Sequence, residues 1–170
     1  MDTGWQRADL WLRGSLPFFT AIILSLFAVV SWPVPYLGPV MPPLAFIALF
    51  YWSAHRPDLF PPAVSFFIGL LNDVLNDLPM GVSALLFTVS HQAICMHRRF
   101  FAESSFFILW AAFAIAVSIF MLLEWVLVSS VQWTTMPILP VIARIVIAIL
   151  VFPLPCWAMI KLQRIVLVSE

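Results

Sequence analysis

Six apolar segments follow one another along this chain, and they restrict its fold more than any other feature of the sequence. They cover residues 16–36, 40–54, 61–77, 81–97, 105–130 and 138–161. A backbone in hydrocarbon must satisfy its own hydrogen bonds, and an α-helix of about 20 apolar residues does so across a bilayer. The sequence therefore predicts an all-α integral membrane protein, with a single transmembrane domain over residues 1–170 and a bundle of six helices.

The composition supports the same class. Hydrophobic residues make up 64% of the chain and charged residues 9%, with a mean hydropathy of +1.07, far from a soluble domain. Eight basic and eight acidic residues cancel, and no segment is basic enough to predict binding to nucleic acid. Residues 1–15 are too few to bury a core, and we expect them to form a short interfacial segment on the cytoplasmic side.

The basic residues predict the orientation, because Lys and Arg are enriched in cytoplasmic loops. They occur before the first segment and then in every second connection: Arg7, Arg13, Arg56, Arg98, Arg99, Lys161 and Arg164. This pattern places both termini in the cytoplasm and requires segment 40–54 to cross, although Pro42 and Pro43 leave it about 18 Å of helix. We expect Arg98 and Arg99 to anchor the inner end of the fourth helix at anionic headgroups or to dock a cytoplasmic partner.

Two neighbouring segments carry polar side chains that lipid alone does not accept. On the third, small and polar residues recur every three or four positions and share one helix face: Ser65, Gly69, Asn72, Asp73 and Asn76. The fourth has a similar stripe: Gly81, Ala84, Thr88, His91, Gln92 and Cys95. Residues 78–81 leave room only for a tight turn, so we predict an antiparallel hairpin with closely packed small faces.

Asp73 is the residue of this hairpin that packing does not explain. A carboxylate deep in a membrane helix costs roughly 2.5–3.5 kcal/mol, so it must face protein, water or a partner. Two interpretations stay open: a structural hydrogen bond to a neighbouring helix, or contact with a transmembrane segment of a partner. We expect Asp77, one turn further on, to lie at the outer interface in water.

Glu124 and Arg144 form a second polar group, in the last two segments. Each lies about six residues from the outer end of its segment, or about 9 Å deep. Equal depth predicts an ion pair that fixes the register of the last hairpin, and contact with a ligand or partner is the alternative.

The remaining polar residues do not predict catalysis, a metal site or a cofactor. His91 and Cys95 have the i, i+4 spacing of a metal pair, with His97 nearby, but no third ligand shares their face. An intramembrane aspartyl peptidase needs two facing carboxylates, whereas Asp73 and Asp77 follow each other on one helix. We therefore expect no enzyme.

The stretch FFIGLLNDVLNDLPMG, from residue 66 on, and the sequence HRRFF after the next apolar segment resemble the family of the rod shape-determining protein MreD. The matching features are Gly69, Leu70, Leu71, Asp73, Pro79, Gly81, Arg98 and Arg99. The motif covers about the middle quarter of the chain, and the size and six-span layout fit the whole. Asn72 and Met80 depart from the commoner pattern.

The resemblance implies a multi-pass protein of the bacterial inner membrane, a non-catalytic scaffold of the cell-elongation complex that supports lateral peptidoglycan synthesis. It implies binding to MreC and, through the complex, to MreB, RodA, a class B penicillin-binding protein and RodZ. Gly69, Asp73, Pro79 and Gly81 then become candidates for partner contact, and a homo-oligomer is left open. The family is also similar in fold to the S components of energy-coupling-factor transporters. A vitamin-binding transporter subunit is therefore the alternative, although the Pro-rich, apolar outer loops favour the scaffold.

Overall fold

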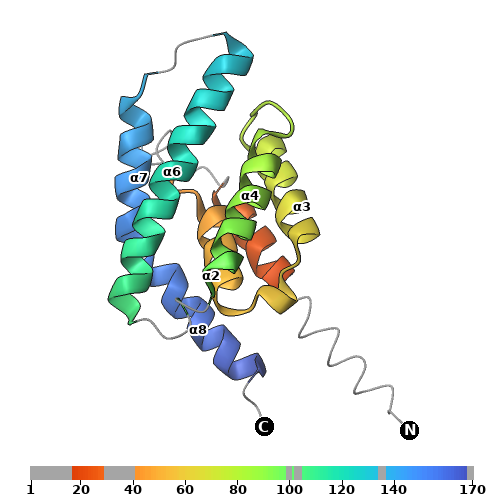
Figure 1. Ribbon diagram of the computed structural model, residues 1–170, viewed down its shortest axis with the longest axis vertical. Helices are drawn as coiled ribbons and strands as arrows, with labels where there is room; N and C mark the ends of the chain where they lie inside the picture. The colour runs from red at the N-terminus through yellow and green to blue at the C-terminus, as the bar shows by residue number, and fades with distance from the viewer. Residues whose placement is uncertain (1–16, 29–40, 99–100, 102–104, 134–136, 168–170) are drawn as a thin grey trace, which may run out of the picture.

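The computed structural model describes residues 17–28, 41–98, 101, 105–133 and 137–167, with side chains up to residue 162. Its regular elements are all helical, which confirms the predicted all-α class for this part of the chain (Figure 1). They are a first helix Pro17–Ala28, α2 (Leu44–His55), a short 3-10 helix η2 (Pro57–Leu59), α3 (Pro62–Leu75), α4 (Val82–Met96), α6 (Phe106–Gln132), α7 (Leu139–Val151) and α8 (Pro153–Leu167).

The α-helices lie largely in the predicted apolar segments, with α6 and α8 ending later than predicted, and they differ in length. Among the described residues, α6 with 27 residues is long and apolar enough to cross a membrane, and α7 with α8 qualifies as one span bent by 43°. The first helix, α2, α3 and α4 are shorter apolar helices. Six crossings, cytoplasmic termini and the likeness to S components therefore stay predictions.

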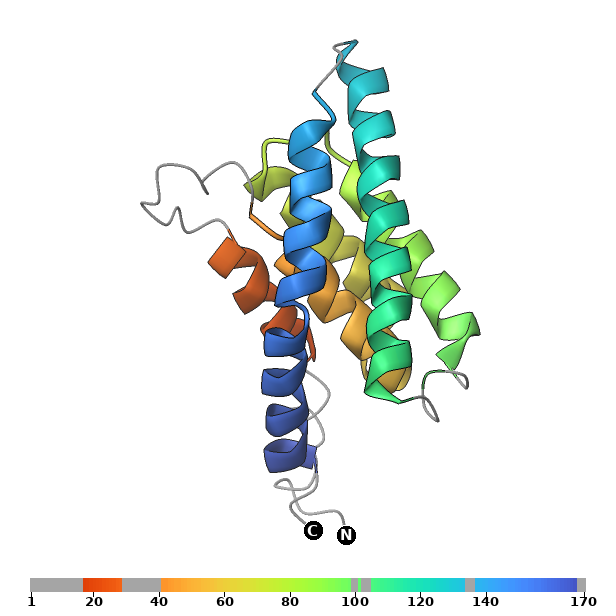
Figure 2. The same cartoon turned by 90° about the vertical axis from the view of Figure 1, so that its left-hand side faces the viewer.

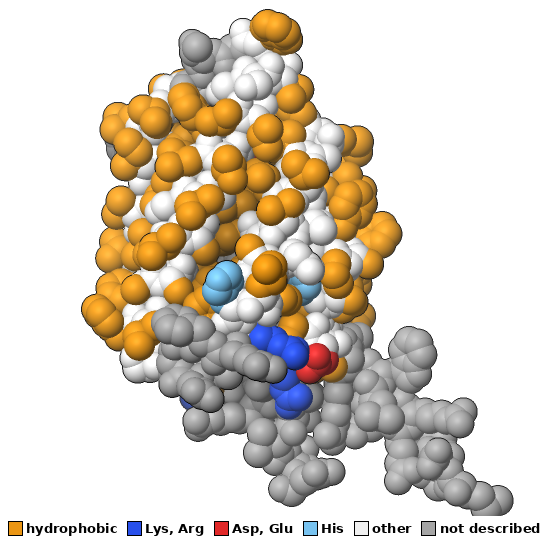
Figure 3. All heavy atoms as spheres, in the orientation of Figure 1, with side chains coloured by type: hydrophobic (Ala, Val, Ile, Leu, Met, Phe, Trp, Pro, Cys, Tyr) orange, Lys and Arg blue, Asp and Glu red, His pale blue; other side chains and the backbone are white. Residues whose placement is uncertain are grey.

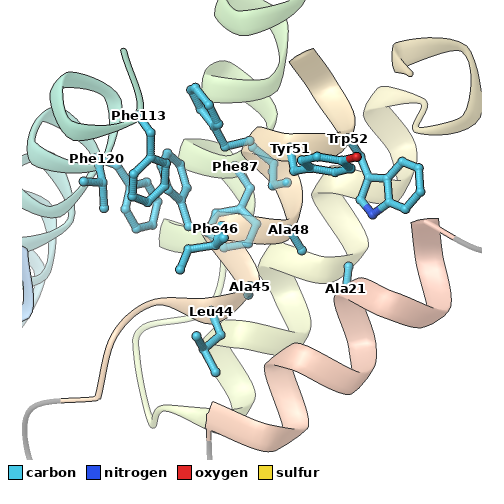
Figure 4. Close-up of a cluster of buried hydrophobic side chains, with 14 of the residues drawn as sticks. Ala21, Leu44, Ala45, Phe46, Ala48, Tyr51, Trp52, Phe87, Phe113 and Phe120 are labelled. Carbon is cyan, nitrogen blue, oxygen red and sulfur yellow. The ribbon is translucent and has the colours of Figure 1, made fainter. Parts of the chain in front are cut away.

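Helices α6 and α7 form a layer in front of α2, α3 and α4 in Figure 2, and α8 runs from the end of α7 beneath α2 in Figure 1. Helix α2 lies between its neighbours, and all of residues 44–54 are buried. Phe46 stacks on Phe120 of α6 at 4.3 Å between ring centroids (Figure 4), and the rings of Phe50 and Phe113 lie 5.3 Å apart. A helix that is apolar on every side is usually surrounded by protein, and α2 is buried by its neighbours over residues 44–54.

The bend between α7 and α8 follows from Pro153. Proline has no N–H, so the carbonyl of Ile149, four residues earlier, loses its partner in the helix. The indole N–H of Trp110 in α6 donates to that carbonyl at 2.8 Å. Phe113 stacks on Phe152 at 4.0 Å beside the bend. A side chain of α6 therefore satisfies the backbone group that the proline leaves free, as a low-dielectric interior requires.

The surface is apolar over the helices and charged at one end. Large hydrophobic side chains are exposed along several helices, among them Phe67 (61%), Ile115 (64%) and Leu150 (67%). In Figure 3 they cover most of the visible face, and basic and acidic side chains gather at its lower edge. An apolar surface of this extent is suited to contact with lipid.

Candidate functional site

Asp73 lies near the end of α3 and caps the neighbouring helix α4. Its side chain is fully buried. Oδ2 accepts a hydrogen bond from the Gly81 N–H and Oδ1 one from the Ser83 N–H, both at 2.8 Å. The first amides of a helix have no partner within it, and negative charge is stabilised beside them. Asp73 therefore accepts hydrogen bonds from the first amides of α4, as an N-cap side chain would, although it belongs to the preceding helix.

The turn between α3 and α4 places these amides over the carboxylate. The Leu78 N–H donates to the Asp73 carbonyl at 2.9 Å, the six-to-one bond of a Schellman motif. Asp77 takes the left-handed conformation that this motif requires, with φ of 53°, and its side chain is exposed. Gly81 has φ of 100°, which residues with a Cβ adopt at a cost. With Pro79 in the turn, these residues return the chain onto α3.

Gly69 lets the two helices of the hairpin touch. A Cβ at this position would lie 2.5 Å from the Ala84 Cα and 2.7 Å from the Ser83 carbonyl oxygen. Both are backbone atoms, so the contact cannot be relieved by a side-chain rotation. Helices α3 and α4 run side by side in both views (Figures 1 and 2). The predicted antiparallel hairpin with a close small-residue contact is therefore present.

A hydrogen-bonded chain connects the hairpin to α6. The Asn72 amide donates to Ser83 Oγ at 3.1 Å, and Ser83 Oγ donates to Glu124 Oε1 at 3.2 Å. Ser83 and Glu124 are both buried. Sequence reasoning singled out Asn72 and Glu124 but missed Ser83, because it lies outside the polar stripe predicted for the fourth segment. Its position, two residues after the turn glycine, is the signal that could have indicated it.

Glu124 and Arg144 line a common pocket of about 80 Å³, together with Leu78, Trp125 and Val141, among others. Within the described residues, however, the ion pair closer than 4.0 Å joins Arg98 to Asp58. Arg144 Nε instead donates to the Met41 carbonyl oxygen at 3.1 Å, just before α2. The two charged side chains therefore line one pocket, which is large enough for water, and do not form a direct ion pair. Arg144 instead connects α7 to the residue before α2.

The other candidates lie toward the opposite end of α4. His91 Nδ1 and Ser53 Oγ are 2.7 Å apart, which joins α4 to α2, and Cys95 Sγ lies 3.5 Å from His91 Nε2. The described residues contain no group of three potential metal ligands. Arg98 Nη1 lies 3.6 Å from Asp58 Oδ1, beside η2. Arg99 lies outside the described residues.

The sequence was compared with known protein families, curated proteins and solved structures. The sequence matches the family described as rod shape-determining protein MreD over residues 10–165 of 170. The chain belongs to the MreD family. This membership assigns it to the membrane proteins involved in rod-shape determination. No curated protein and no solved structure matches it. The α3–α4 hairpin, with Gly69, Asp73, Pro79 and Gly81, lies inside the matched region.

Proposed function

We propose that the chain is a non-catalytic scaffold subunit of the bacterial cell-elongation complex, held in the inner membrane by several crossings. In this role it binds MreC and, through the complex, supports lateral peptidoglycan synthesis by RodA and a class B penicillin-binding protein, together with MreB and RodZ. The observation that carries the proposal is the match to the MreD family, because it covers nearly the whole chain.

The distribution of polar groups supports a structural role. Both oxygens of Asp73 accept hydrogen bonds from backbone amides. Glu124 accepts a hydrogen bond from Ser83, and Arg144 donates one to the Met41 carbonyl. Asp73 and Glu124 each join two helices, and Arg144 joins α7 to Met41 just before α2, so these contacts fix the helices relative to one another. We infer that Asp73 acts on partners indirectly, because it holds the hairpin turn in one conformation.

The end of the molecule at that turn is suited to partner contact. The ends of α3 and α6 and the starts of α4 and α7 lie at the same end of the molecule (Figure 1). Met80 between α3 and α4, Trp133 at the end of α6 and Leu139 at the start of α7 are 74%, 93% and 74% exposed. Exposed aromatic and Met side chains are typical anchors of protein interfaces. We infer that this end faces outward and contacts MreC, with Arg56 and Arg98 at the cytoplasmic end.

Depletion of the protein in its host, followed by microscopy, tests the function. We expect rod-shaped cells to become round, and wild-type protein to restore the rods. Normal shape with a new growth requirement for a vitamin would contradict the scaffold and favour the transporter alternative.

Co-purification with MreC tests the contact surface. We expect Trp133→Ser and Met80→Ser to keep normal membrane levels but to retain less MreC than wild type. Gln132→Ala, at the same end of the molecule, is the matched control and should retain MreC fully. Undiminished MreC with the double variant Trp133→Ser/Met80→Ser would refute this surface.

A further inference from the structure

A groove between α4 and α6 extends from the molecular surface to the central helix. It has a volume of about 570 Å³. Helices α4 and α6 form its sides, with α2 behind them in Figure 1, and Phe50 of α2 forms its floor. Small side chains make the hollow: Ser90 and Ala93 on α4, Ala112 and Ala116 on α6.

The dimensions of the groove indicate what it can hold. Its lining runs from Ser90 to His97 on α4 and from Ala112 to Ile119 on α6, or about 10 Å along each helix. One leaflet of the hydrocarbon core is about 15 Å deep, and a transmembrane helix crosses about 30 Å. The groove is therefore much shorter than a transmembrane helix, whereas a segment of a lipid acyl chain fits along it.

One end of the groove lies next to a basic residue. His97 and Phe101 line that end, and Arg98, which follows His97, has a side chain that is 53% exposed. The contact with Asp58 engages one nitrogen of its guanidinium group, which carries five N–H donors. Arginine binds phosphate through paired hydrogen bonds. In Figure 3 basic side chains gather directly below the apolar face. An apolar groove that ends at His97, with a half-exposed arginine at the next position, is complementary to an anionic lipid.

We propose that the groove binds an acyl chain of an anionic phospholipid, with the lipid phosphate held by Arg98. The bound chain fills the space between α4 and α6 above Phe50, so the lipid becomes part of the packing of the two layers. This site needs only that the protein lies in a membrane. It does not depend on the proposed binding to MreC, and failure of either proposal leaves the other standing.

Photo-crosslinking in nanodiscs tests the proposal. The full-length protein is placed in discs with equal amounts of phosphatidylglycerol and phosphatidylethanolamine, one of which carries a diazirine on its acyl chain. We expect cross-links to concentrate on residues 90–97 and 112–119, with about a fivefold preference for phosphatidylglycerol, because one basic side chain near an anionic surface contributes about 1 kcal/mol. Cross-links spread evenly over the lipid-facing helices, or equal for the two lipids, would overturn it.

Substitutions test which residues form the site. Ala116→Phe and Ala93→Leu fill the groove from its two sides and should each lower these cross-links several-fold, whereas Ala111→Phe on the exposed face of α6 should not. Arg98→Gln should abolish the preference for phosphatidylglycerol, and Lys161→Gln should keep it. Folding of each variant is checked by its unfolding in detergent. Unchanged cross-links in the folded filling variants, or efficient disulfide dimers of Ala93→Cys that reveal a second copy in the groove, would refute lipid binding.

Discussion

Replacement of Asp73 gives the sharpest test of how the hairpin is held. Asp73→Ala removes the acceptors of two amides in a fully buried environment, and the Gly81 and Ser83 N–H groups then have no side chain to bond. A hydrogen bond to a charged group contributes about 1.5–3 kcal/mol. Two such bonds give an expected loss of about 3–6 kcal/mol in the free energy of unfolding, above the roughly 0.5–2 kcal/mol of an ordinary N-cap.

Asp73→Asn should lie between wild type and Asp73→Ala. The amide keeps one acceptor oxygen, but its NH₂ group faces the other backbone N–H and cannot accept from it. Asp77→Asn is the matched control, because Asp77 is exposed and asparagine tolerates its φ of 53°. Its unfolding free energy should stay within about 0.5 kcal/mol of wild type.

Equilibrium unfolding of the purified protein in mixed micelles with increasing SDS, followed by circular dichroism, measures these differences. An unfolding free energy for Asp73→Ala within about 0.5 kcal/mol of wild type would refute the capping role. If such a stable variant also lost MreC, Asp73 would be a direct partner contact, and the inference that it acts through the turn would be wrong.

Two further predictions concern helix packing and use the same unfolding assay. Gly69→Ala should destabilise the protein by about 1–3 kcal/mol, because the new Cβ meets the Ala84 backbone at 2.5 Å; wild-type stability would show that the helices can separate at no cost. Trp110→Phe should cost about 1–3 kcal/mol because it leaves the Ile149 carbonyl unsatisfied. In a Pro153→Ala background, where a backbone N–H is restored, the same substitution should cost less, and an equal cost would contradict this account of the bend.

The hairpin could be predicted from the sequence in outline but not in its bonding. The spacing of Gly69 and Asp73 indicated one helix face, and the short connection to Gly81 indicated a tight turn. The partner of Asp73 was not predictable, because it is a pair of backbone amides, which every sequence contains. Only the conformation of the turn, with its left-handed Asp77, brings those amides to the carboxylate.

The depth of Glu124 and Arg144 in the membrane, counted in residues, was not enough to predict their contacts. Counting residues placed both near one level, and they do line one pocket. Each residue along a helix is rotated by 100°, however, so equal depth does not fix the direction of a side chain. Arg144 extends to the carbonyl of Met41, a backbone acceptor that the sequence does not mark. The bend at Pro153 was predictable in principle, since a proline inside a helical segment removes a backbone hydrogen bond.

The residues that carry the MreD resemblance in the hairpin serve one local structure. Gly69 sets the distance between the helices, Gly81 and Pro79 turn the chain, and Asp73 fixes the first turn of α4. None of these roles is a contact with another molecule, whereas Met80, in the same turn, is 74% exposed. Loss of rod shape should therefore arise in two separable ways. Variants of Asp73 or Gly69 should lose both MreC binding and stability. Met80→Ser should lose MreC binding but keep the unfolding free energy of wild type. If both kinds of variant lowered the unfolding free energy, or neither did, this division would be wrong.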